Sequence, residues 1–190
     1  MKRLFDFLLA SFGTLLFSPI AFLFALLVKA EDGGSVFYTQ DRWGRNGKKF
    51  KAYKFRTMVP GAELQWGLKP ADENDERVTR IGRFLRATAM DELPQLLNIW
   101  KGDMSFVGPR ALAVEDVDPG IPGFSERHLI RPGLTGPAQV YARRDASIHE
   151  KFRYDLDYVR CHPFRVDLQL LFFSVWITLR GKWESRAKKI

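Results

Sequence analysis

The feature that most constrains this chain is an apolar segment close to its N-terminus. Residues 7–28 contain no charged side chain, and Lys2, Arg3 and Lys29 flank them. A helix that crosses the hydrocarbon core of a bilayer needs about 20 apolar residues, so the segment is long enough. It is also long for the apolar part of a cleaved signal peptide, and no small-x-small cleavage site follows Val28. We therefore expect a retained membrane helix.

Ser18 and Pro19 lie in the middle of this segment and predict a break in the helix. Proline has no backbone N–H and crowds the preceding turn, so we expect a kink near Ser18. Membrane helices tolerate proline, which leaves a simple bent span open. Lys2 and Arg3 favour a cytoplasmic N-terminus. If the basic remainder is cytoplasmic too, both ends lie on one side and the helix must enter the membrane and turn back.

Charge and composition narrow the classes of partner. The chain has 190 residues, a net charge of +8 and 14% aromatic residues. A basic balance favours nucleic acid, acidic lipid head groups or phosphorylated substrates, and the many aromatic residues favour the membrane surface. The single cysteine, Cys161, cannot form an internal disulfide, which indicates a reducing compartment. The three histidines show no zinc-like spacing, and no Walker-type phosphate loop is present.

The remainder of the chain reads as a mixture of helices, one hairpin and irregular segments. Residues 166–179 are apolar and precede a basic tail, and we leave open whether this helix packs in the core or lies at the membrane interface. The predicted elements are a β-hairpin at 36–56, a loop at 60–78, a helix at 79–89, a helix after Asp91, an irregular stretch at 104–140, and helices at 149–160 and 166–179.

Two adjacent carboxylates, Asp91 and Glu92, open one of the predicted helices. The commoner explanation is capping, with Asp91 at the N-cap and Pro94 in the first turn. The same position also suits chemistry, because a helix N-terminus attracts phosphate and a carboxylate can act as a covalent nucleophile. Spacing alone favours the cap, so both explanations stay open at this point.

Chemistry on a diphosphate would require charge neutralisation by Mg²⁺ and by basic side chains. Asp91 and Glu92 are the candidate metal ligands, and Asp103 is a weaker one. Arginine suits phosphate through its planar fork, although any single basic residue is more commonly a solvated surface group. The candidate phosphate clamps are Lys54, Arg56, Arg86, Arg110 and Arg131.

Taken together, these motifs resemble the bacterial sugar transferases, in the small form of the monotopic phosphoglycosyl transferases. The resemblance covers nearly the whole chain and rests on eight motifs in a fixed order. They are Lys2-Arg3-x-x-Asp6, Ser18-Pro19, Gln40-x-Arg42-x-Gly44, Lys54-Phe55-Arg56-Thr57-Met58, Asp91-Glu92-Leu93-Pro94-Gln95-Leu96, Gly102-Asp103-Met104-Ser105, Gly108-Pro109-Arg110 and Arg131-Pro132-Gly133-Leu134-Thr135-Gly136. Local departures are Ala111, Pro137 and the run Tyr141-Ala142-Arg143-Arg144, which lie near the expected donor site.

The resemblance implies an enzyme that transfers a sugar-1-phosphate from a UDP-sugar to polyprenol phosphate, usually undecaprenyl phosphate, and releases UMP. It implies that Asp91 is the nucleophile of a covalent phosphosugar intermediate and that Glu92 is its Mg²⁺-associated partner. Arg86 and Arg110 match substrate-contacting positions, and we add Gln139 to the predicted substrate-binding residues. Ser18 and Pro19 match the break of a re-entrant membrane helix. Such a reaction initiates the assembly of a glycan.

We therefore expect an α+β, mostly helical single domain over residues 1–190. Residues 1–29 form the re-entrant helix, and residues 30–190 form a compact catalytic part with a small β-hairpin and interfacial amphipathic helices on the cytoplasmic face of the inner membrane. The expected partners are the UDP-sugar, polyprenol phosphate and membrane lipids, with no nucleic acid, and we leave a homo-oligomer open. The alternative is a non-catalytic basic module that binds anionic lipid or nucleic acid at the membrane surface.

Overall fold

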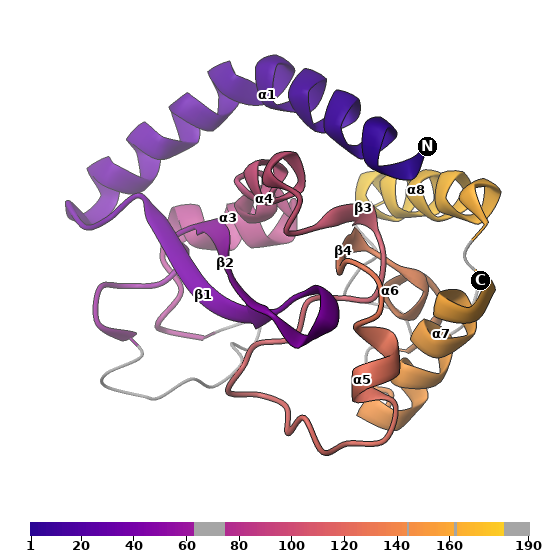
Figure 1. Ribbon diagram of the computed structural model, residues 1–190. Coiled ribbons are helices and arrows are strands. Elements are labelled where there is room, and N and C mark those ends of the chain that lie inside the picture. The colour runs from indigo at the N-terminus through magenta and orange to yellow at the C-terminus, as the bar shows by residue number, and fades with distance from the viewer. Residues whose placement is uncertain (63–74, 144, 162, 181–190) are drawn as a thin grey trace.

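The computed structural model describes residues 1–62, 75–143, 145–161 and 163–180. Most of the predicted loop at 60–78 and nearly all of the basic tail lie outside these residues. The described part is mostly helical with one hairpin, as predicted (Figure 1). In chain order its elements are α1 (Lys2–Asp32), β1 (Phe37–Trp43), η1 (Arg45–Gly47), β2 (Lys49–Phe55), α3 (Arg80–Ala87), η2 (Met90–Glu92), α4 (Gln95–Lys101), β3 (Ser105–Val107), α5 (Phe124–Arg127), β4 (Gly133–Thr135), α6 (Pro137–Tyr141), α7 (Ile148–Cys161) and α8 (Phe164–Leu179).

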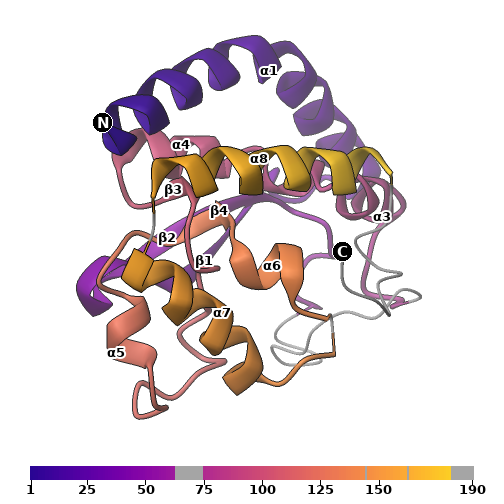
Figure 2. The same ribbon diagram turned by 90° about the vertical axis from the view of Figure 1, so that its right-hand side faces the viewer.

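Helix α1 is a single curved helix that arches over the rest of the protein (Figures 1 and 2). Pro19 lies inside it and cannot donate a hydrogen bond to the carbonyl of Leu15, four residues earlier. The hydroxyl of Ser18 donates to that carbonyl instead, at 2.8 Å. The Ser18-Pro19 pair therefore bends the helix without ending it, because the serine supplies the donor that the proline lacks.

Both ends of α1 are attached to the rest of the chain by polar contacts. Near the N-terminus, the buried Asp6 accepts hydrogen bonds from the hydroxyl of Ser105 and the backbone N–H of Phe106. At the C-terminal end, Asp32 forms an ion pair with Arg56, with 2.6 Å between Oδ2 and Nη1. Between these anchors the helix exposes apolar side chains, including Leu15, which is 77% exposed.

The predicted hairpin is confirmed. Strands β1 and β2 pair antiparallel with Gln40 opposite Ala52, and η1 forms the turn between them. Asn46 and Gly47 both adopt positive φ in this turn, which is the conformation that tight turns require and that Asn and Gly tolerate best. The hairpin places Lys54, near the end of β2, next to the segment that contains Asp91 and Glu92.

The stretch at 104–140 was predicted to be irregular, and it contains a short parallel pair of strands, β3 and β4. Three-residue strands are too short to show alternation in sequence, so the pattern could not reveal them. Glycine makes this pairing possible: a Cβ on Gly133 would lie 2.1 Å from the backbone nitrogen of Gly108, and one on Gly136 would lie 2.0 Å from the Gly108 carbonyl oxygen. The segments around Gly108 and Gly133 can lie this close together because neither glycine has a side chain.

One face of helix α8 packs in the core, and another face exposes apolar side chains. Leu170 and Ile177 pack in a cluster with Val107 and Val140. Phe172 and Val175 on the same helix are more than half exposed. Core packing of this helix is thus confirmed for its inner face, and an interfacial position of its outer face stays a prediction.

Candidate active site

The carboxylates Asp91 and Glu92 lie in a short turn, η2, between α3 and α4. Ala89 precedes the turn with φ 56° and ψ 17°, in the left-handed region that non-glycine residues rarely adopt. Strained backbone of this kind persists only where the surrounding structure imposes it, and it concentrates at functional sites. The left-handed residue turns the chain sharply after α3 and presents both carboxylates toward β2.

The prediction that Asp91 caps the following helix is wrong. Helix α4 begins at Gln95 and its N-cap position is Pro94, which makes no side-chain capping bond. Asp91 lies within the turn η2, and Leu93 and Pro94 follow this turn before α4 begins. The Asp91 side chain is therefore not occupied by a capping hydrogen bond.

Lys54 and Arg110 meet the two carboxylates from different elements. The ammonium of Lys54 lies 2.7 Å from Oε1 of Glu92 and 3.6 Å from Oδ2 of Asp91. Arg110 donates to the same Glu92 oxygen at 3.1 Å. Less than a fifth of the Lys54, Asp91 and Glu92 side chains is exposed. The structure therefore brings together two predicted carboxylates and two predicted phosphate-binding cations at one largely buried place.

The two neighbouring carboxylates differ in their electrostatics. Burial raises the pKa of Asp91 above its ordinary value, and Lys54 only partly opposes this shift. Burial also acts to raise the pKa of Glu92, but Lys54, Arg110 and Arg42 outweigh it and hold that pKa well below its usual range. Glu92 is thus a permanently ionised, doubly paired group, whereas Asp91 is the more basic carboxylate and accepts no hydrogen bond from a described residue.

The structure places the remaining predicted site residues at various distances from the two carboxylates. Arg86 is exposed on α3, and its charge opposes the increase that burial causes in the pKa of Asp91. Arg56 is instead paired with Asp32 at the end of α1. Gln139 donates to the carbonyl of Leu134, and its own side-chain oxygen is buried without a donor among the described residues.

Two other predicted residues lie at the far end of α4. Arg131 donates to the carbonyl of Gly102, directly after that helix. Asp103 lies 3.4 Å from the side-chain nitrogen of Asn98 and is not grouped with Asp91 and Glu92. No cluster of three His, Cys, Asp or Glu side chains able to hold a metal occurs in the part of the chain that the structure describes. The metal-ligand candidates that remain together are Asp91 and Glu92.

Two arginines contribute to the site although the sequence did not single them out. Arg42 on β1 donates to the carbonyl of Ala111 at 2.6 Å, and its charge lowers the pKa of Glu92. Arg127 donates to the carbonyl of Arg110 at 2.9 Å and forms a buried ion pair with Asp155. Arg42 belongs to a quoted motif, which was a usable signal. Arg127 had none, because its partners lie 17 and 28 residues away.

Comparison with known proteins identifies the family. The family model described as "Bacterial sugar transferase" matches residues 1–181 of the chain. The chain belongs to this family. The exopolysaccharide production protein ExoY of Rhizobium meliloti (strain 1021) is 41% identical over 188 residues, which cover 92% of the chain and 83% of ExoY.

Two longer members of the family carry names that describe a reaction. The UDP-glucose:undecaprenyl-phosphate glucose-1-phosphate transferase of Escherichia coli (strain K12) is 39% identical over 184 residues. The UDP-N-acetylgalactosamine-undecaprenyl-phosphate N-acetylgalactosaminephosphotransferase of Aeromonas hydrophila is 38% identical over 187 residues. These matches cover 93% and 95% of the chain but only 39% and 44% of the two relatives. The chain therefore spans less than half the length of these two proteins.

Proposed function

We propose that this chain transfers a sugar-1-phosphate from a UDP-sugar to a polyprenol phosphate, undecaprenyl phosphate, and releases UMP. The observation that carries the proposal is the Asp91 carboxylate, which is largely buried beside Lys54 and accepts no hydrogen bond from a described residue. The reactions named for the two longer relatives support the same substrate classes.

In the first step, a carboxylate oxygen of Asp91 attacks the β-phosphorus of the UDP-sugar. A bond forms between that oxygen and the phosphorus, the bond from the phosphorus to the bridging oxygen breaks, and UMP leaves with the electron pair. The enzyme then carries the sugar phosphate as an acyl phosphate on Asp91. The raised pKa of Asp91 supports this role, because a more basic carboxylate is a better nucleophile once it is ionised.

In the second step, an oxygen of the polyprenol phosphate attacks the same phosphorus. The bond from the phosphorus to Asp91 breaks, the carboxylate is restored, and a polyprenol diphosphate sugar is the product. Lys54 and Arg110 each donate one hydrogen bond to Glu92 and keep further N–H donors, which can stabilise the phosphoryl oxygens at both steps.

The paired carboxylates also fit a magnesium ion. Mg²⁺ is typically held by one or two carboxylates together with substrate phosphates, and Asp91 and Glu92 are two adjacent carboxylates, of which Asp91 lacks a hydrogen-bond donor among the described residues. When bound, the ion would neutralise charge on the diphosphate of the substrate. Glu92 stays ionised at neutral pH because Lys54 and Arg110 hold its pKa low, so it is a suitable ligand.

Helix α1 supports a re-entrant anchor. It is long and apolar enough to cross a membrane. Asp6 near its start and Asp32 at its end nevertheless both bind the same body of the protein, while the apolar middle is exposed. We infer that α1 enters the membrane and returns, so that residues 30–190 lie with the N-terminus on the cytoplasmic face of the inner membrane.

The decisive experiment separates the two half-reactions. Purified protein in neutral detergent with Mg²⁺ is mixed with each of a panel of UDP-sugars before any polyprenol phosphate is added. We expect the correct donor to release UMP in an amount equal to the enzyme, because the sugar phosphate stays on Asp91. A donor that yields turnover with lipid but no UMP without it would exclude the covalent step, and EDTA should abolish both.

The anchor is tested separately by labelling cysteines. Cys161 is the single cysteine and is exposed, so a membrane-impermeant maleimide reports the side on which α7 lies. In a Cys161→Ser background, a cysteine inserted directly after Met1 reports the N-terminus. We expect both to be labelled from the same side of inverted membrane vesicles. Labelling from opposite sides would establish a spanning helix.

A further inference from the structure

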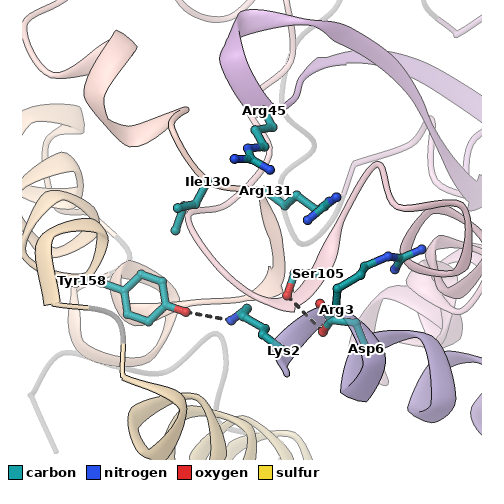
Figure 3. A pocket seen from close by; sticks show the side chains of 8 residues that line it. All are labelled: Lys2, Arg3, Asp6, Arg45, Ser105, Ile130, Arg131 and Tyr158. Atoms are coloured by element: carbon teal, nitrogen blue, oxygen red, sulfur yellow. Dashed lines mark hydrogen bonds between the residues drawn. The ribbon is translucent and has the colours of Figure 1, made fainter.

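A polar cavity lies at the opposite end of α4 from Asp91. It has a volume of about 160 Å³, many times the roughly 10–15 Å³ that a cavity needs on this measure to hold one water molecule. Four cations contribute to its wall from three segments: α1, the turn η1 and the chain before β4 (Figure 3). Its lining residues are Lys2, Arg3, Asp6, Arg45, Ser105, Ile130, Arg131 and Tyr158.

The arginines of this basic pocket have no carboxylate partner among the described residues. Arg3 donates to the carbonyls of Ile99 and Trp100, each at 2.6 Å. Arg45 and Arg131 each donate through Nε to a backbone carbonyl, at 3.1 and 2.7 Å. The terminal nitrogens of Arg45 and Arg131 make no hydrogen bond within the described chain, so four donor groups remain available.

The two acidic groups nearby are already engaged. Asp6, which lines the pocket, accepts hydrogen bonds from Ser105 and Phe106. Asp167 on α8 forms an ion pair with Lys2 at 2.6 Å and accepts a short hydrogen bond from the Tyr158 hydroxyl. Even with Asp167 counted, the four cations of the pocket outnumber these two carboxylates, so the pocket keeps a net positive charge.

Gathering three guanidinium groups in this way is unfavourable without an anion. Burial lowers the pKa of Arg131, and the charges of Arg3 and Arg45 lower it further. Mutual repulsion of this kind is relieved when a negative ion binds, and arginine pairs with phosphate through two parallel hydrogen bonds. The shape and the charge of the pocket thus both suit a phosphate group.

The pocket is also next to the apolar surface of the protein. Lys2 and Arg3 are in the first turn of α1, directly before Leu4, which is 63% exposed. Phe5 packs edge-on against Phe164 at the start of α8, with 5.2 Å between the ring centroids. The phosphate group of a lipid can therefore occupy the pocket while the hydrocarbon chains of the same lipid lie along α1 and α8.

This site is separate from the proposed reaction centre. Helix α4 has seven residues, and Asp91 precedes it whereas Gly102, the partner of Arg131, follows it. Seven helical residues span about 10 Å, so a phosphate held by Arg131 cannot at the same time be the phosphorus that reacts with Asp91.

We propose that the basic pocket binds the phosphate of an anionic phospholipid from the membrane that α1 enters. Arg45 and Arg131 hold the phosphate oxygens with their terminal nitrogens, and the acyl chains run along the exposed apolar face of α1. The lipid thereby stabilises the junction between α1, α8 and the end of α4. This inference does not depend on the reaction proposed for Asp91.

Thermal unfolding in neutral detergent tests the proposal with the whole chain. The probes are phosphatidylglycerol, phosphatidylcholine and inorganic phosphate, each added to the native protein and to Arg45→Gln, Arg131→Gln and their double variant. Binding to the folded state alone raises the unfolding temperature, so phosphatidylglycerol should raise that of the native protein and phosphatidylcholine should not. The double variant should lose most of this rise. Arg153→Gln, which changes an exposed arginine on α7, should keep it.

Other outcomes would overturn the proposal. An unchanged rise in the double variant would exclude this pocket, since any other anion site is left intact. An equal rise with inorganic phosphate would exclude the phospholipid as the source. If the double variant does not fold, Arg45→Gln alone decides the matter, because Arg45 is exposed and gives up only one hydrogen bond to a backbone carbonyl.

Discussion

The charged side chains at the two ends of α4 differ in how the protein neutralises them. Before the helix, the carboxylates Asp91 and Glu92 are matched by Lys54 and Arg110 at distances of 2.7 to 3.6 Å. After the helix, Arg3 and Arg131 lie close together and donate only to backbone carbonyls. The carboxylates at one end are paired with cations of the protein, whereas the arginines at the other end have no carboxylate partner among the described residues.

Under the two proposals made above, this basic chain uses the charges at one end of α4 for chemistry and those at the other end for binding. A nucleophile needs a preorganised and partly desolvated setting, so its counter-charges are built in. A binding pocket gains affinity from charges that the free protein leaves unsatisfied, because the ligand then supplies the missing partner.

The largest effect is expected from Asp91→Asn. A carboxamide cannot form the acyl phosphate, so UMP release should fall by roughly 10⁴-fold or more, the scale seen when a catalytic nucleophile is removed. The measurement is the rate of UMP release with the correct donor and lipid. Asp157→Asn is the matched control, because Asp157 is exposed on α7. Native turnover in the Asp91 variant would exclude Asp91 as the nucleophile.

Lys54→Met removes one of the two cations that neutralise the carboxylates Asp91 and Glu92. Removing the ammonium should slow turnover by roughly 10²-fold to 10³-fold, as the loss of one electrostatic donor does elsewhere. Asp91 attacks only when ionised, and Lys54 lowers its pKa, so without Lys54 the acidic limb of the pH–rate profile should move to higher pH. Lys54→Arg should keep that limb in place. A limb that does not move in Lys54→Met would mean that another group titrates.

His128 links the two ends and predicts a pH effect on stability. Its backbone carbonyl accepts from Asn46 beside Arg45, and its neighbour Arg127 holds the carbonyl of Arg110. Burial lowers the pKa of His128 from 6.5 to about 4. Between these values the unfolded chain binds a proton that the folded chain does not, so stability should fall as the pH drops from about 6.5 to about 4.

The size of this effect follows from the shift. It corresponds to a loss on the order of 3 kcal/mol across the window, and His128→Asn should remove that part of the pH dependence. The measurement is the unfolding temperature of both proteins in neutral detergent at several pH values. Parallel curves for the two proteins would show that His128 is not the titrating group.

Asn98 holds α4 in place between the two sites and gives the smallest predicted effect. Its side chain is fully buried, accepts from the backbone N–H of Tyr53 at 3.0 Å and donates to the carbonyl of Lys51 at 2.8 Å. Asn98→Ala should reduce stability by about 1–3 kcal/mol, because the Tyr53 N–H loses its partner. Both UMP release and stabilisation by phosphatidylglycerol should weaken. Leu97→Ala, at a partly exposed position of the same helix, should leave both readouts close to native.

Much of the fold could be predicted because its signals are local. The length of α1, the hairpin with its Asn-Gly turn, and α7 follow from hydrophobic pattern and turn residues. The strained turn before Asp91 could not be predicted, since alanine favours helix and nothing local requires the left-handed conformation of Ala89.

The candidate site was predicted in part. Asp91, Glu92, Lys54 and Arg110 are together as expected, whereas Arg131 is at the opposite end of α4 and Arg56 is paired with Asp32. Arg56, Arg110 and Arg131 all belong to similar glycine-rich or basic motifs, so composition could not show which of them contacts the carboxylates. Which of them reaches the carboxylates depends on chain pairings such as that between β3 and β4.

By itself, the sequence determined the long apolar N-terminal helix, the mixture of helix and hairpin, the acidic pair and the excess of basic residues. The tertiary structure alone decided which charges are paired and which remain free. The physical reason is that charge interactions depend on distance and burial. Lys54 and Glu92 are 38 residues apart in the chain and 2.7 Å apart in space, and no sequence pattern encodes that proximity.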